Sequence, residues 1–222
     1  MLYGDNRPTI MKAEIDTRKW IEDKVGEIKW GDFNDFLNLR EDLIKEDKTI
    51  EWDISKLRKE IFRKKLCHVT PEHFRDEIVD KAFEIFIAKR HEIKLFNGVK
   101  ESLKNLSKKY TLGVLTNGNA DVYKFDIGRY FNFSISSLEA KDSKPNRAHF
   151  DMAISKVNDI SFNNILHIGD HQINDILCAH NLGIDTLWFN NTNQSWSQDF
   201  EKPDEFSSWA NLEQIIRNKY ER

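Results

Sequence analysis

The chain has 222 residues, of which 39% are hydrophobic, 12% aromatic and 32% charged, and its formal net charge is -3 at pH 7. Aromatic side chains supply the bulky core material that disordered chains lack, so we expect one large globular domain or a domain with an insertion. The slight excess of acidic residues is unfavourable for binding nucleic acid through its phosphates. The sequence also has no apolar run of about 18 residues that would predict a membrane-spanning helix. We therefore expect neither a nucleic-acid nor a membrane partner.

The first residues and the cysteines indicate the compartment. Met1 is not followed by the basic and apolar segments that form a signal peptide. Cys67 and Cys178 are too few for a disulfide framework, and neither has the neighbours of a zinc site. We therefore expect two small apolar cysteines in a protein of the reducing cytoplasm.

The residues before about Leu95 have the spacing of amphipathic helices. Apolar side chains recur at intervals of three and four residues in four segments. The segments are 8–25, 33–44, 54–66 and 70–91. The last one begins with Thr70 and Pro71, an N-cap residue followed by proline at the first helical position.

From about Phe96 onward, short apolar strands alternate with helices. Strands are predicted at 111–115, 134–138, 164–168 and 184–189, helices at 99–108, 145–157, 174–181 and 211–220, and a loop at 190–206. This alternation favours an α/β fold with a parallel sheet. In such a fold, ligands collect at the carboxyl ends of the strands.

Three sites follow the predicted strands or begin a helix. Thr116, Asn117 and Gly118 come directly after the first strand, where a hydroxyl and backbone N–H groups can hold a phosphate oxygen. The alternative is a β-hairpin, because Asn-Gly between apolar residues is a strong hairpin signal. The residues from Ala120 to Tyr130 show no returning strand, which favours the phosphate site.

Lys144 and two aspartates make up the other two sites. Lys144 lies directly before Pro145 and can neutralise a phosphate, or it is a solvated surface charge. Asp170 ends a strand and Asp175 lies in the first turn of the next helix, so the two carboxylates can converge on one Mg²⁺. The alternative is a Gly-Asp turn followed by an aspartate that the helix dipole favours. That alternative does not explain why all three sites lie at one edge of the sheet.

These residues resemble the motifs of a known family. Thr116 after 112–115, Lys144 in Ser-Lys-Pro, and the segment 169–175 are similar to the second, third and fourth motifs of the haloacid dehalogenase superfamily. The resemblance covers essentially the whole chain. It implies a Rossmann-like parallel-sheet core at residues 1–10 and 95–222, with an inserted helical cap at 11–94.

The superfamily's first motif is missing from this sequence. That motif is a strand ending in Asp-x-Asp-x-Thr, whose aspartates are the nucleophile and the general acid/base. Here Met1 stands directly before the run that follows the motif, and none of Asp5, Asp16, Asp32 and Asp35 is a convincing substitute. The resemblance places the absent strand between the strands that end at Leu115 and Ile168. We therefore expect a truncated chain that is inactive as written, from a start codon assigned too late or from a decaying gene.

The resemblance implies a Mg²⁺-dependent phosphatase of small phosphorylated metabolites that works through an aspartyl-phosphate. Thr116, Asn117 and Gly118 would hold the phosphate, and Lys144 would pair with it and with the nucleophile. Asp170 and Asp175 would bind Mg²⁺. The run at 2–8 is similar to a branch that dephosphorylates 5-amino-6-(5-phospho-ribitylamino)uracil of riboflavin biosynthesis, FMN or similar phosphates.

Other functions remain open. The chain is alternatively a catalytically dead protein that binds phosphate or a partner. A dehalogenase is a weaker alternative, because it needs the same absent aspartate and has no use for metal ligands. We expect a monomer or a weak dimer.

Three further residues have weaker signals. Arg58 belongs to a basic stripe on the third helix that could attract an anionic substrate, although a solvated helix face explains the stripe equally well. His167 is expected in the core. His171 follows the metal-binding aspartate and either touches substrate or is partly exposed without a role.

Overall fold

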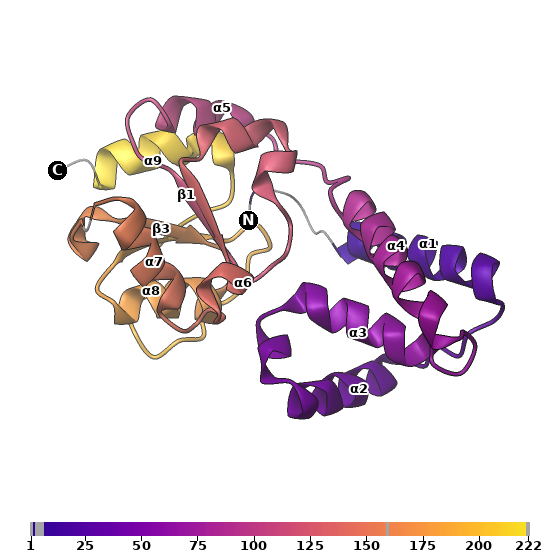
Figure 1. Ribbon diagram of the computed structural model, residues 1–222. Helices are drawn as coiled ribbons and strands as arrows, with labels where there is room; N and C mark the ends of the chain where they lie inside the picture. The colour runs from indigo at the N-terminus through magenta and orange to yellow at the C-terminus, as the bar shows by residue number, and fades with distance from the viewer. Residues whose placement is uncertain (1, 3–6, 159, 221–222) are drawn as a thin grey trace. The chain divides into compact units, whose positions relative to one another are not determined.

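The computed structural model describes residues 2, 7–158 and 160–220, and the chain forms two compact units (Figure 1). Unit 1 comprises Met1–Gly4, Lys94–Asn117 and Asp121–Arg222, and unit 2 comprises Asp5–Ile93 and Gly118–Ala120. Along the chain the units meet between Ile93 and Lys94, one residue from the expected boundary. At the other end, residues 7–10 begin the first helix of unit 2, whereas the sequence assigned them to the core.

Unit 2 is helical, as predicted. Its helices are α1 (Arg7–Val25), α2 (Phe33–Glu46), α3 (Ile54–Leu66) and α4 (Glu72–Arg90), with a 3-10 turn at Lys48–Glu51. Asp32 begins α2 with a capping box: its side chain accepts from the amide of Asp35, whose own side chain accepts from the amide of Asp32. The apolar stripes of α1, α3 and α4 meet in a core that includes Ile21, Phe62 and Val79, all fully buried.

Unit 1 contains the predicted parallel strands. β1 (Gly113–Thr116) pairs with β2 (Phe133–Ser136), and β3 (Leu166–Gly169), β4 (Asp185–Phe189) and β5 (Asp204–Phe206) form a second sheet in that order. Every pairing is parallel. Within the described residues, no strand joins β1 to β3. The α/β fold class is thus confirmed, and the expected position of an absent strand stays a prediction.

Helices cover both faces of these strands. They are α5 (Val99–Leu106), α6 (Ser137–Ala140), α7 (Ala148–Lys156), α8 (Cys178–Asn181) and α9 (Leu212–Lys219). α5 and α9 lie on one face and α7 and α8 on the other (Figure 1). The largest core cluster lies on the α5 and α9 side, and Leu2 packs against it with its carbonyl accepting from the Phe96 amide at 3.3 Å. None of the helices described here is long and apolar enough to cross a lipid bilayer.

Four predicted elements of unit 1 are wrong in detail. The predicted strand 134–138 ends at Ser136, because Ser136 and Glu139 form a capping box that begins α6. The predicted helix 145–157 begins only at Ala148, after a turn closed by the bond from the Asn146 amide to the Ser143 carbonyl (3.0 Å). The predicted helix 174–181 begins as a π-helical turn at Gln172–Leu177. The predicted loop 190–206 ends in β5, which is too short and too polar to show a strand pattern.

Candidate functional site

Lys144 is the centre of the site at the carboxyl ends of β1 and β3. Its ammonium donates to Asp175 Oδ1 at 2.6 Å and to the Leu115 carbonyl at 2.8 Å, and the residue is 8% exposed. The solvated-surface alternative for Lys144 is therefore wrong. One fixed positive charge joins the end of β1 to the segment that follows β3.

Asp175 is held from two sides. Its second oxygen, Oδ2, accepts from the backbone amides of Asp170 (3.2 Å) and His171 (3.1 Å). Burial opposes ionisation of Asp175, but His167 and the Lys144 ammonium together hold its pKa well below the ordinary value. Asp175 is therefore an anion throughout the physiological range.

Gly169 makes room for this carboxylate. A Cβ atom at Gly169 would lie 2.2 Å from the Cβ of Asp175, a distance that no side chain can occupy. The glycine of the Gly-Asp pair is therefore required by a close approach of the following helix turn to the end of β3. The sequence showed the glycine but not this reason for it.

Asn117 binds the backbone of Lys144. Its Nδ2 donates to the Lys144 carbonyl and its Oδ1 accepts from the Lys144 amide, both at 2.8 Å. The Asn117 carbonyl in turn accepts from Ser137 Oγ at 3.2 Å. The side chain of Asn117 thus positions Lys144. The predicted contact between Asn117 and a phosphate oxygen would therefore have to come from the backbone amide of Asn117, and it stays a prediction. Gly118 is grouped with unit 2, and its phosphate contact stays a prediction.

Three histidines surround the site, and sequence reasoning missed what they contact. His149 is fully buried, and its Nε2 lies 3.2 Å from the Thr116 carbonyl. His167, which was expected in the core, is partly buried on β3, with Nε2 3.6 Å from Asp175 Oδ1 and its ring edge-on to Phe150. Burial lowers the pKa of both His149 and His167, so both are neutral at pH 7. No local sequence pattern indicates these partners, because they lie far apart along the chain.

His171 begins the helix turn that carries Asp175. Its Nδ1 accepts from the amides of Ile173 (3.2 Å) and Asn174 (3.0 Å), so it acts as an N-cap. His171 is thus exposed but has a structural role as a cap, and a contact with substrate stays a prediction. Histidine is not a usual N-cap residue, so no sequence pattern predicted this cap.

Asp170 is one of the two predicted Mg²⁺ ligands. It is exposed at the carboxyl end of β3, and its carbonyl accepts from Trp188 Nε1 at 3.1 Å. In the described part of the chain, no three His, Cys, Asp or Glu side chains gather in a metal-binding group. One exposed carboxylate nonetheless suits Mg²⁺, which keeps several waters and is completed by substrate phosphate. Both carboxylate oxygens of Asp175 already accept hydrogen bonds, from Lys144 and from the amides of Asp170 and His171. Direct binding of Mg²⁺ by Asp175 stays a prediction.

Arg58 lies inside unit 2. Its guanidinium pairs with Glu14 of α1 and stacks 3.6 Å from the ring centre of Phe86 in α4. A substrate contact by Arg58 stays a prediction.

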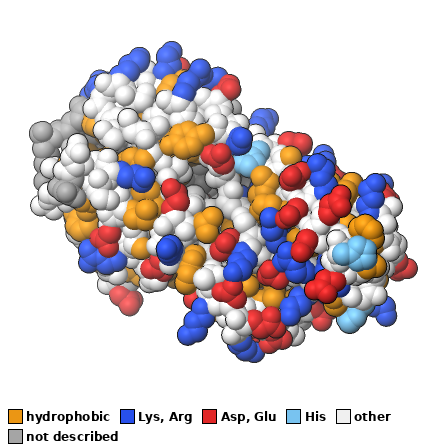
Figure 2. Space-filling model, in the orientation of Figure 1, with side chains coloured by type: hydrophobic (Ala, Val, Ile, Leu, Met, Phe, Trp, Pro, Cys, Tyr) orange, Lys and Arg blue, Asp and Glu red, His pale blue; other side chains and the backbone are white. Residues whose placement is uncertain are grey.

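Four other basic residues of α3 are paired with acidic residues. Lys56 pairs with Asp47, Lys59 with Asp80, Arg63 with Asp76, and Lys64 with Glu46. Blue and red side chains accordingly alternate over this unit in Figure 2. These pairs favour the solvated-face interpretation of the stripe.

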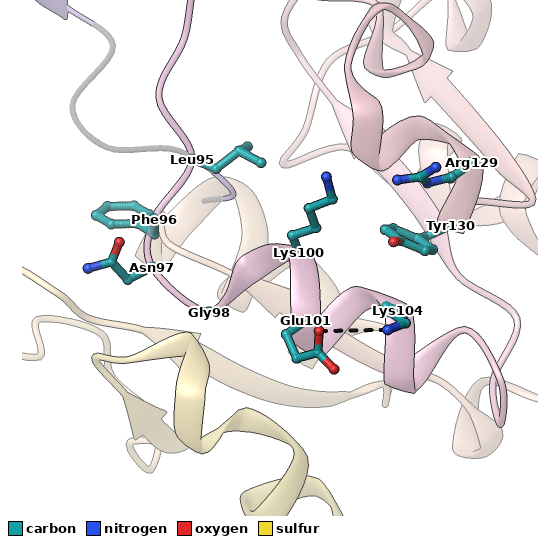
Figure 3. Close-up of a pocket in the computed structure, with 9 residues that line it drawn as sticks. All are labelled: Leu95, Phe96, Asn97, Gly98, Lys100, Glu101, Lys104, Arg129 and Tyr130. Atoms are coloured by element: carbon teal, nitrogen blue, oxygen red, sulfur yellow. Dashed lines mark ion pairs between the residues drawn. The ribbon is translucent and has the colours of Figure 1, made fainter.

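A cavity of about 760 Å³ in unit 1 lies apart from these residues. It is lined by Leu95, Phe96, Asn97, Gly98, Lys100, Glu101, Lys104, Arg129 and Tyr130 (Figure 3). Lys100 projects between the Leu95 side and the Arg129 side, and Glu101 pairs with Lys104 at 4.0 Å. The cavity contains none of the predicted site residues.

Comparisons with known proteins identify relatives of this chain. The haloacid dehalogenase-like hydrolase family matches residues 31–189. The 5-amino-6-(5-phospho-D-ribitylamino)uracil phosphatase YigB of Escherichia coli (strain K12) is 26% identical over 217 residues, which cover 96% of this chain and 91% of YigB. The pyrimidine 5'-nucleotidase YjjG of the same organism is 25% identical over 154 residues, which cover 67% of this chain and 65% of YjjG.

Solved structures show the same fold. The 2-haloacid dehalogenase from Pseudomonas syringae pv. Tomato DC3000 has a TM-score of 0.90 and 28% identity, covering 98% of this chain and 94% of that one. The HAD phosphatase from Thermococcus onnurineus has a TM-score of 0.66 and 18% identity, covering 95% and 91%. The family match spans most of the chain and includes Thr116, Lys144 and Asp170. The chain therefore belongs to the haloacid dehalogenase-like hydrolase family.

Proposed function

We propose that this protein is a Mg²⁺-dependent phosphatase of small phosphorylated metabolites. The observation that carries the proposal is the buried Lys144 ammonium, fixed by Asp175 and Leu115 where β1 and β3 end. A preorganised cation in a site with little water stabilises a phosphoryl group more strongly than a mobile surface lysine does. The position of this charge is fixed by Asp175 and by the two hydrogen bonds between the Asn117 side chain and the Lys144 backbone.

Each residue of the site has its own proposed role in binding phosphate or Mg²⁺. Thr116, at the end of β1, presents its hydroxyl to a phosphate oxygen, and Lys144 offsets the negative charge of the phosphoryl group. Asp170 holds Mg²⁺, which supplies further charge neutralisation when bound. The attacking carboxylate that the resemblance implies is not among the described residues that contact Lys144. We therefore propose that these residues bind phosphate and Mg²⁺, and that none of the described residues supplies the nucleophile for turnover.

Two relatives support a substrate class. YigB is named for a ribityl phosphate and YjjG for pyrimidine 5'-nucleotides, and both are phosphate monoesters of sugar-like chains joined to a heterocycle. We propose 5-amino-6-(5-phospho-ribitylamino)uracil, or FMN, as the substrate of a cytoplasmic monomer or weak dimer. A second candidate is haloacid dehalogenation, which the 28% identity and TM-score of 0.90 to a 2-haloacid dehalogenase favour.

One set of titrations tests the phosphate site. The full chain is titrated calorimetrically with inorganic phosphate, with and without Mg²⁺. We expect binding that Mg²⁺ strengthens, that Lys144→Met abolishes and that Asp170→Asn makes independent of Mg²⁺. Lys156→Met is the matched control, because Lys156 is an exposed lysine of α7. Phosphate binding that Lys144→Met leaves unchanged would contradict the proposal.

Assays of turnover separate the candidate functions. Phosphate release from p-nitrophenyl phosphate and halide release from 2-chloropropionate are measured side by side. Binding of phosphate without turnover supports the proposed division between binding residues and nucleophile. Halide release without phosphate binding would replace the phosphatase with the dehalogenase.

A further inference from the structure

Gln172 ties the turn after Asp170 to a distant loop. Its Nε2 donates to the Ser195 carbonyl at 2.8 Å. Its Oε1 accepts from the Ser197 amide at 3.0 Å and from Ser197 Oγ at 2.9 Å. Both ends of one side-chain amide are therefore used to hold residues that lie more than twenty positions further along the chain.

The loop that Gln172 holds, residues 190–200, is itself well fixed. Asn190 closes its base, because its side chain donates to the Gln194 carbonyl and accepts from the Gln194 amide. Trp196 packs 5.4 Å from Trp188 and 5.1 Å from Phe200, between ring centres, and its Nε1 donates to the Phe200 carbonyl. The 190–200 loop thus offers Gln172 a rigid support.

The 190–200 loop is also connected to Asp170, through Trp188. The fully buried Trp188, against which Trp196 packs, donates from Nε1 to the Asp170 carbonyl at 3.1 Å. Asp175 holds the Asp170 amide. The backbone of Asp170 is therefore fixed at both its carbonyl and its amide, and Gln172 fixes the turn immediately after it.

We propose that Gln172 is a positioning residue that sets the direction of the Asp170 carboxylate toward a divalent cation. Mg²⁺ demands near-ideal octahedral geometry, so a site with a single protein carboxylate depends on how firmly that carboxylate is aimed. Binding groups held by neighbouring hydrogen bonds lose less freedom when the ligand arrives. The inference rests on the proposed function only in taking Asp170 as the residue that holds Mg²⁺.

The test uses the full chain, calorimetric titration with Mg²⁺ alone, and three variants. Gln172→Met has a similar length and removes all three hydrogen bonds. Gln172→Glu keeps the acceptor for Ser197 and loses the donor to Ser195. Gln198→Met is the matched control, because Gln198 is a half-buried glutamine of the same loop that donates to Ser197 Oγ at 3.3 Å and lies outside the turn after Asp170.

We expect Gln172→Met to raise the Mg²⁺ dissociation constant about tenfold, the lower end of what loss of a supporting hydrogen bond costs a metal site. Gln172→Glu should raise it less, and Gln198→Met should leave it unchanged. Hydrogen exchange of the amides of residues 170–175 should be faster in Gln172→Met than in Gln198→Met. These exchange rates report on the turn even if a variant is less stable overall.

Several results would overturn the inference. One is a Mg²⁺ dissociation constant that Gln172→Met leaves unchanged. Another is a Mg²⁺ dissociation constant that Gln198→Met raises as much as Gln172→Met does. The third is an unmodified protein that binds no Mg²⁺. Failure of the proposed function looks different: Mg²⁺ binds with the expected order of variants, but phosphate neither binds nor is released from esters.

Discussion

At the scale of single residues, the Lys144–Asp175 pair dominates the site. Taking two charges out of water is costly, and the attraction between them repays that cost only when further hydrogen bonds complete both groups. Here Leu115 completes the ammonium, and the amides of Asp170 and His171 complete the carboxylate. The pair is therefore better understood as fixing a charge for function than as a source of stability.

Removing one partner of the pair should be strongly destabilising. In Lys144→Met, Asp175 keeps its charge in a buried place without the ammonium, which costs about 3–5 kcal/mol of unfolding free energy. The double variant Lys144→Met/Asp175→Asn should recover part of the loss, because the asparagine carries no charge. Urea denaturation measures both. A single variant as stable as Lys156→Met would show that the pair is solvated in solution.

His149, which is buried, and His167, which is partly buried, predict that stability depends on pH. Burial lowers the pKa of His149 and His167 from 6.5, so the folded protein resists protonation that the unfolded chain accepts. Stability is therefore fully present above about pH 6.5 and falls as the pH drops toward the lowered pKa values. His149→Leu should reduce the slope by up to about 1.4 kcal/mol per pH unit. Urea denaturation between about pH 7.5 and pH 5 measures how the unfolding free energy changes with pH. An unfolding free energy of the unmodified protein that stays constant over this range would contradict the prediction.

The sequence was informative about which residues form the site and uninformative about their partners. Thr116, Lys144 and Asp170 could be selected because each follows a strand or begins a helix, which a local pattern reveals. The hydrogen bonds between Asn117 and Lys144 join residues 27 positions apart, and the bond from Lys144 to Asp175 joins residues 31 positions apart. Such contacts depend on how the strands are ordered in space, and no periodicity encodes that.

At the scale of elements, the turn between β3 and α8 needs a glycine. Gly169→Ala should force Asp175 away from the strand end, because the new Cβ would meet the Asp175 side chain at 2.2 Å. Overpacking of this kind costs about 1–3 kcal/mol, and we also expect weaker phosphate binding because Lys144 loses its partner. Denaturation and phosphate titration together measure the effect.

Gly183→Ala is the control for this substitution. Gly183 has a φ of +72° and open space around its missing Cβ, so alanine there adds backbone strain without a collision. It should lower stability by about 1–2 kcal/mol and leave phosphate binding unchanged. Equal loss of phosphate binding in both variants would show that the close approach at Gly169 is unimportant.

Element types could be predicted where the periodicity was long. The helices of unit 2 match their predicted segments closely, since each carries an apolar stripe over three or more turns. β5 and the π-helical turn at Gln172–Leu177 could not be predicted. The first is a three-residue strand defined by pairing with β4, and the second is shaped by the His171 cap and by Asp175.

At the scale of the whole molecule, the described residues of unit 1 form two sheets, and the carboxyl end of β1 lies beside that of β3. Lys144 joins the end of β1 to the segment after β3, so the carboxyl ends of both strands lie on the same side. Residues from both strands or their flanks, such as Leu112 and Ile168, pack against one core cluster. In the described residues, β1 pairs on one edge with β2, and β3 pairs on one edge with β4. Sheets of parallel strands are ordinarily buried and continuous, so the second edges of β1 and β3 suit one further strand.

Hydrogen exchange can test that prediction inside a single molecule. β4 is paired on both edges, with β3 and with β5, whereas β1 and β3 are each paired on one edge in the described residues. In the full chain, amides of β1 and β3 should therefore exchange faster than those of β4, because open edges require less unfolding to reach water.

A protein extended by the in-frame upstream codons should show β1 and β3 protected to the level of β4, if those codons encode the strand that the resemblance places there. It should also be more stable, because four to six ladder hydrogen bonds at about 1 kcal/mol each would be added. Equal protection of β1, β3 and β4 in the unextended chain would contradict the prediction, because no edge would then be left to pair.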